Sequence, residues 1–245
     1  MYKDSDYAPK SGAGEFFNTS VRSGNVQNSF INRVFGWMFA GLALTGAVSW
    51  YLGTYWAEKI IMYRKAFIVL AIAEFLVVIV MTAGLRKFNA MVAALLFGVF
   101  ALLNGITLSW IFMAYSTEVI AGTFFATSGT FGAMGLYGYL TKRDLSSVGS
   151  LCTMGLIGLI IASLVNMFWY NRTADLIISY IGVLLFVGLT AWDVQKIKLL
   201  AMECAAGAID RREAKKYAIL GALELYLDFI NLFIFILRIV NGGRK

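Results

Sequence analysis

Histidine is absent from the 245-residue chain, and proline occurs only once, at Pro9. Without an imidazole, the chain has no histidine for acid–base catalysis, metal binding or pH sensing, so any proton chemistry has to use carboxyl groups. The two cysteines, Cys152 and Cys204, lie in an apolar run and in a charged connection. Such a pair indicates neither a disulfide framework nor a cysteine-based metal site.

Charge is also scarce, because only 14% of the residues are charged while 60% are hydrophobic. A soluble domain carries about a quarter charged residues. Seven apolar runs are each long enough to cross about 30 Å of hydrocarbon as a helix. They lie at about 34–53, 66–85, 91–113, 119–140, 148–170, 176–195 and 217–240. The sequence therefore predicts an all-α integral membrane protein, a bundle of seven transmembrane helices in a lipid bilayer.

The polar segments set the expected orientation. Residues 1–33 lack the features of a secretory signal and are predicted to form a polar cytoplasmic tail. The net charge of +7 does not indicate a nucleic-acid partner, because most Lys and Arg lie in short connections. Of the 21 basic residues, 14 fall on the side of the N-terminus, which the positive-inside rule places in the cytoplasm. The distribution of basic residues does not assign the short C-terminal end 241–245 to either side of the membrane.

The sequence predicts local structure in two further segments. The connection 196–216 mixes apolar residues with both charge signs, which predicts an amphipathic helix lying on the membrane surface. Glycine recurs every third residue in the fourth run, and this spacing favours close packing between helices. The glycines are Gly129, Gly132, Gly135 and Gly138.

Ionisable residues inside the apolar runs are the candidates for function, because each costs at least about 2.5–3.5 kcal/mol at the centre of a membrane helix. They are Glu74, Asp193, Glu224, Asp228 and Arg238. In the last run, polar residues share one stripe at helical spacing. The stripe comprises Gly221, Glu224, Asp228, Asn231, Phe235 and Arg238. A helix with this stripe cannot face lipid, so the seventh helix is predicted to lie centrally.

Asp193 ends the sixth run and has two possible partners on the seventh. Glu224 matches its depth better, whereas Asp228 lies deeper, and the spacing does not choose between them. Two carboxyl groups that meet in a dry site share a proton and respond to pH, and they could also contact Ca²⁺ through oxygen. The alternative is a structural acid that Arg238 or Arg86 neutralises.

The segment 224–239, ELYLDFINLFIFILRI, resembles the last membrane segment of the Bax inhibitor family. The segment 188–195, GLTAWDVQ, resembles the sixth-helix motif of that family, and Phe35-Gly-Trp-Met, Gly41-Leu and Thr45-Gly resemble the opening helix of its bacterial members. The resemblance covers about residues 30–240. It departs from the family at Trp192 and Val194, where the family often has Tyr and Thr.

The resemblance implies a pH-sensitive calcium leak around a central last helix, located in a bacterial inner membrane. It also implies that Asp193 and Asp228 are the pH-sensing pair and that Glu74 and Arg86 support them. Glu224, Asn231 and Arg238 are expected along the ion pathway. Under this hypothesis the partners are Ca²⁺ and H⁺, and no cofactor is expected.

Three other functions compete with the leak. A protein that modulates a membrane-bound protease or a stress pathway would use the 1–33 tail, and an exchanger would trade protons for a cation. An intramembrane aspartyl protease would need a Gly-x-Gly-Asp motif and a later Pro-Ala-Leu, but Tyr226 and Leu227 precede Asp228 and no proline follows Pro9. We therefore expect no enzymatic activity.

Overall fold

The computed structural model describes residues 12–62, 66–84 and 88–242, and every regular element in these ranges is a helix. The helices are α1 (Gly12–Tyr55), α2 (Ala57–Met62), α3 (Ala66–Ala83), α4 (Ala90–Ala114), α5 (Thr117–Leu140), α6 (Ser146–Phe168), α7 (Arg172–Ala205) and α8 (Arg211–Gly242). Within the described ranges, six of them are long and apolar enough to cross a membrane, namely α1 and α4 to α8. The apolar part assessed in α3, Val69–Ala83, is shorter. Six of the seven predicted crossings are therefore supported by length and composition.

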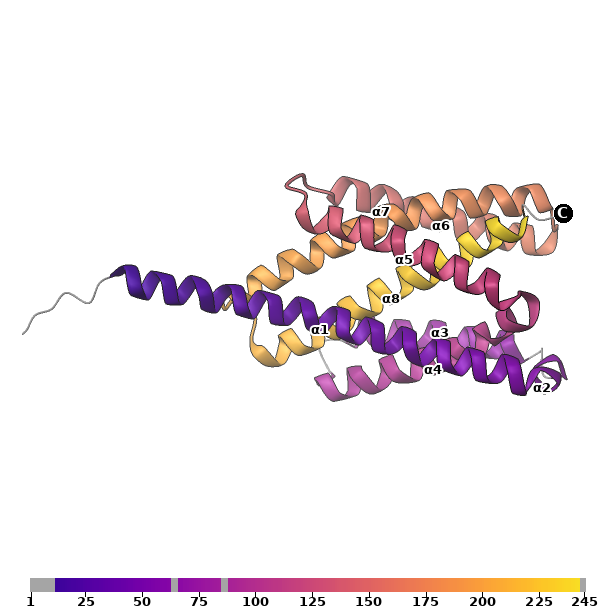
Figure 1. Ribbon diagram of the computed structural model, residues 1–245, viewed down its shortest axis with the longest axis horizontal. Helices are drawn as coiled ribbons and strands as arrows, with labels where there is room; N and C mark the ends of the chain where they lie inside the picture. The colour runs from indigo at the N-terminus through magenta and orange to yellow at the C-terminus, as the bar shows by residue number, and fades with distance from the viewer. Residues whose placement is uncertain (1–11, 63–65, 85–87, 243–245) are drawn as a thin grey trace, which may run out of the picture.

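Helix α8 lies at the centre of the bundle, as its polar stripe predicts. It packs against α1, α4, α5 and α7, and Figure 1 shows it passing between the other helices. In the most apolar 18-residue stretch of α8, 67% is buried. The buried share of the corresponding stretch in each other candidate span is at most 39%. A membrane helix buried to this extent can carry polar side chains without exposing them to lipid.

Tyr226 fixes α8 against α1 and α4. Its ring is fully buried and packs edge-on against Phe97 and Phe100, with centroid separations of 5.7 and 5.6 Å. Its hydroxyl lies 2.7 Å from Oγ1 of Thr45, and that hydroxyl donates in turn to the carbonyl of Ala101 at 2.9 Å. A buried polar group with satisfied hydrogen bonds selects one arrangement of the three helices.

The glycines of α5 have unequal roles. A Cβ atom at Gly138 would clash with the carbonyl oxygen of Ala191, so the backbones of α5 and α7 approach closely there. At Gly135 the nearest atom, on Val194, is 3.6 Å away, and at Gly129 and Gly132 nothing lies within 4 Å. The predicted close packing therefore holds at Gly138 and not along the whole stripe.

Two sequence predictions are corrected by the structure. The segment 196–216 is not a separate surface helix, because α7 continues to Ala205 and a turn at Gly207, with φ of 79°, leads directly into α8. Glycine adopts such a positive φ at little cost, which is why the helix ends there.

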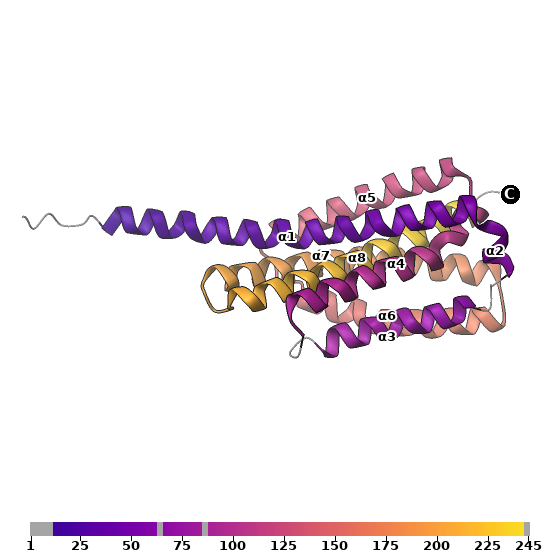
Figure 2. The same ribbon diagram turned by 90° about the horizontal axis from the view of Figure 1, so that it is seen from below.

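The second correction concerns the predicted tail 1–33. Helix α1 begins at Gly12 and continues into the first apolar run, and no proline interrupts it. Figure 2 shows the start of α1 extending beyond the other helices. Residues 1–11 lie outside the described residues.

Candidate functional site: a carboxyl cluster beside an internal cavity

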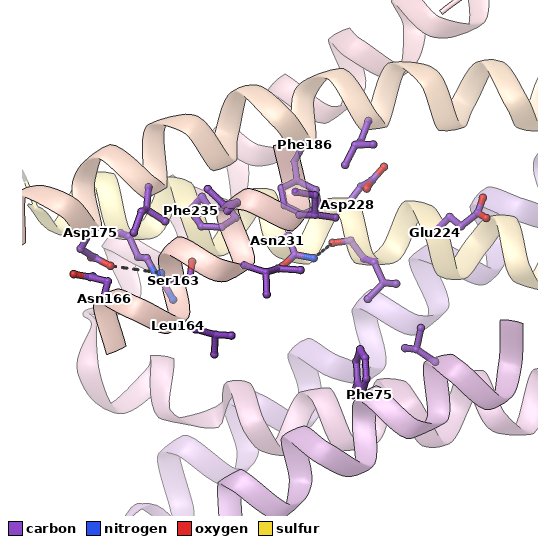
Figure 3. A pocket seen from close by; sticks show the side chains of 18 of the residues that line it. Phe75, Ser163, Leu164, Asn166, Asp175, Phe186, Glu224, Asp228, Asn231 and Phe235 are labelled. Atoms are coloured by element: carbon purple, nitrogen blue, oxygen red, sulfur yellow. Dashed lines mark hydrogen bonds and ion pairs between the residues drawn. The ribbon is translucent and has the colours of Figure 1, made fainter. Parts of the chain in front are cut away.

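A cavity of about 860 Å³ lies between α3, α6, α7 and α8. The polar stripe of α8 forms one wall, as Figure 3 shows. This wall includes Glu224, Asp228, Asn231, Phe235 and Arg238. Five of the six residues that the helical spacing placed on one stripe thus border the same space.

Asp193 and Asp228 meet at this cavity. Asp193 comes from α7 and Asp228 from α8, and the two carboxyl groups are close neighbours at the cavity wall. Both residues are buried, with 6% and 4% of their surface exposed. The second oxygen of Asp228, Oδ2, is buried and has no hydrogen-bond partner among the described residues. A hydrogen bond between these two carboxyl groups would require one of them to keep its proton, because two ionised carboxylates offer no donor to each other.

Lys196 links a third acid, Glu224, to the pair of Asp193 and Asp228. Its Nζ lies 3.0 Å from Oδ1 of Asp193 and 2.7 Å from Oε2 of Glu224. It also lies 4.8 Å from the centre of the Trp192 ring. Asp228 is the neighbour of Asp193 on α8, and Glu224 is joined to Asp193 through the lysine. The depth argument favoured Glu224 because it ended the sixth helix at residue 195, whereas α7 continues ten residues further.

The opposite end of the cavity holds a second ion pair. Arg238 lies 3.6 Å from Asp175, and its guanidinium is 5.7 Å from the centre of the Phe235 ring. Arg238 therefore does not neutralise Asp193 or Asp228. Asn231 lies between the two ends and donates to the carbonyl of Leu227 at 2.8 Å.

Glu74 lies apart from the aspartate pair. It accepts hydrogen bonds from Thr107 at 2.8 Å and from Asn104 at 3.2 Å, so it joins α3 to α4. This geometry corresponds to a packing acid with satisfied partners. Arg86, the other residue that the resemblance implicated, lies outside the described residues.

The acids do not form a ready-made metal site. In the part of the chain that the structure describes, no three or more Asp, Glu, Cys or His side chains are grouped closely enough to hold a metal ion. Ca²⁺ takes six to eight oxygen ligands. Two carboxyl groups supply only part of such a shell.

Sequence reasoning missed Lys196 and Asp175. Lys196 was assigned to the connection after the sixth run, although it follows Asp193 by three residues and so shares its helix face. That spacing could have identified it. Gln195 was noted only as part of a motif, yet it is 8% exposed and binds the α5–α6 connection. Its amide donates to the carbonyl of Arg143 at 2.8 Å and accepts from the amide of Leu145 at 2.9 Å.

Comparison with known proteins identifies the family of the chain. The family model described as inhibitor of apoptosis-promoting Bax1 matches residues 27–245. The inner membrane protein YbhL of Escherichia coli K12 is 47% identical over 222 residues, which cover 88% of this chain and 92% of that protein. Protein RP147 of Rickettsia prowazekii is 41% identical over 88% of this chain and 90% of its own length. The chain belongs to the Bax inhibitor family.

Proposed function

We propose that the protein is a pH-regulated Ca²⁺ leak channel whose gate is the Asp193–Asp228 pair. One observation carries the proposal: two buried carboxyl groups on different helices contact each other at the wall of a cavity. Ionisable groups placed inside a membrane domain mark ion or proton pathways by default. In this proposal the protein catalyses no covalent reaction and needs no cofactor.

The shared proton connects α7 to α8. While it is present, the pair carries one negative charge and a hydrogen bond joins the two helices. Once it is lost, two carboxylates repel each other at short range unless a cation lies between them. The contact between the helices therefore depends on pH without any histidine.

Ca²⁺ and protons compete for the same oxygens in this proposal. Ca²⁺ is a hard cation that prefers carboxylate oxygen, and it binds only the deprotonated groups. Lys196 already places a positive charge beside Asp193 and Glu224. It acts as a tethered cation that an incoming Ca²⁺ has to displace.

The membrane topology is the remaining part of the proposal. We place α3 in the membrane as the seventh crossing and the N-terminus in the cytoplasm, where most basic residues gather. The Asp193 end of the cavity then lies toward the cytoplasm, and the Asp175–Arg238 ion pair lies toward the outer end. The likeness to YbhL supports an inner-membrane location.

Flux in proteoliposomes tests the leak. The purified protein is reconstituted with a Ca²⁺ indicator inside the vesicles, and Ca²⁺ entry is followed down its gradient at equal pH on both sides. Entry that only dissipates the Ca²⁺ gradient, and is not reversed by an imposed proton gradient, supports a leak. Ca²⁺ accumulation against its own gradient, driven by an imposed proton gradient, identifies an exchanger instead. Absence of flux at every pH contradicts both and favours a protein that acts by binding a partner.

A further inference from the structure

A second cavity, of about 670 Å³, lies away from the carboxyl cluster, between α1 and the start of α8. Figures 1 and 2 show α1 passing beside the turn that joins α7 to α8. Apolar groups that line this groove include Val26, Phe30 and Ala214, and Phe30 is buried. The groove thus has an apolar floor at one end of the membrane bundle.

Four cations surround this floor. Arg33 comes from α1, whereas Arg211, Arg212 and Lys215 come from the first turns of α8. All four side chains are exposed, and none forms an ion pair among the residues that the structure describes.

Among the residues that the structure describes, no acidic side chain lines the groove. Two acids adjoin the arginines of α8 in sequence: Asp210 accepts a hydrogen bond from the backbone amide of Arg212 at 3.3 Å, and Glu213 lies outside the lining. Like charges that converge without a counter-ion repel each other and create a positive potential that attracts anions.

We propose that this groove binds the phosphate headgroup of an anionic phospholipid, with the start of an acyl chain on its apolar floor. Arginine presents a planar fork of donors that matches phosphate oxygens, and three of the four cations are arginines. Basic pockets at the membrane surface bind anionic headgroups in this way. A free phosphate would satisfy the cations but would leave the exposed side chain of Val26 without an apolar partner.

Lipid binding by the full-length protein tests the proposal. The protein in neutral detergent is titrated with phosphatidylglycerol, and bound lipid is counted by native mass spectrometry. The test variant is Arg33→Gln/Arg212→Gln, which removes one cation from each helix of the groove. The control is Lys142→Gln/Arg143→Gln, which removes the same charge from exposed positions in the α5–α6 connection, outside the groove.

The groove variant should bind phosphatidylglycerol roughly 10- to 30-fold more weakly, at about 1 kcal/mol for each basic residue near a headgroup. The control variant should bind it as the unmodified protein does, and zwitterionic phosphatidylcholine should bind weakly to all three. Equal weakening in both variants, or equal binding of the two lipids, would overturn the proposal. Displacement of the lipid by glycerol phosphate at equal concentration would assign the site to a soluble phosphate and refute the lipid.

Discussion

The ammonium group of Lys196 lies 2.7 Å from the carboxylate of Glu224 on the next helix. The same ammonium lies 3.0 Å from Asp193, so one lysine balances part of the negative charge at the inner end of the cavity. In the proposed state with one proton shared between Asp193 and Asp228, the three acids carry two negative charges and Lys196 carries one positive charge. In that state the cluster retains a net attraction for a cation.

Replacing Lys196 with glutamine should increase Ca²⁺ flux several-fold, because it removes the tethered cation that competes for Asp193 and Glu224. Flux into proteoliposomes at a fixed Ca²⁺ gradient measures the change. The matched control is Lys198→Gln, since Lys198 donates to the carbonyl of Tyr139 at 2.7 Å instead of pairing with the acids. Slower flux in Lys196→Gln than in the control would show that the lysine supports the pathway instead of competing with the ion.

Replacing Glu74 with glutamine should lower stability by about 1–2 kcal/mol, because the amide cannot accept both hydrogen bonds from Asn104 and Thr107. The pH dependence of Ca²⁺ flux should remain as in the unmodified protein, since Glu74 contacts neither aspartate of the pair. Thermal unfolding in detergent and flux against pH test the two parts separately. A shifted flux profile in a stable Glu74→Gln protein would place Glu74 in the gate.

The close approach of α5 and α7 gives a matched pair of glycine substitutions. Gly138→Ala should destabilise the protein by about 1–3 kcal/mol or more, because the new methyl group would meet the carbonyl of Ala191. Gly132→Ala, nearly two turns away in a position with free space, should be tolerated. Thermal unfolding midpoints in one detergent compare them. Equal midpoints would contradict the packing role of Gly138.

We expect Asp144 to make a pH-dependent contribution to the stability of the protein at the start of α6. Its carboxylate accepts hydrogen bonds from the amide and hydroxyl of Ser146, at 2.9 and 2.7 Å, and these hold its pKa below the usual value. Because the folded pKa is the lower one, the contribution is present above the unfolded pKa and is lost as pH falls through the folded pKa. Asp144→Asn should therefore lower the unfolding midpoint at neutral pH, and the difference should shrink below about pH 4. A difference that stays constant with pH would contradict this role.

Much of the fold could be predicted because lipid imposes simple rules. Long apolar runs gave the helices, and the stripe through Glu224, Asp228 and Arg238 placed the last helix at the centre. These predictions need only the spacing of residues along one helix.

The remaining details depend on contacts between helices, which spacing alone does not determine. The sequence could not choose between Glu224 and Asp228 because the choice depends on how far α7 continues past residue 195. Lys196 was assigned to the connection and Asp193 to the helix for the same reason, because the predicted sixth helix ended at residue 195. The pairing of Arg238 with Asp175 joins residues 63 positions apart on two helices, and only the packed bundle brings them together.

The most direct test of the account is Ca²⁺ flux against pH for the unmodified protein, Asp193→Asn and Asp228→Asn in the same liposomes. Each variant keeps the shape of the side chain and removes one titrating group. Asn231→Ala is the control, because Asn231 borders the same cavity and carries no charge. The account predicts a pH-dependent flux in the unmodified protein and in the control, and a flux without that transition in both aspartate variants. An unchanged pH profile in Asp193→Asn and Asp228→Asn would contradict it.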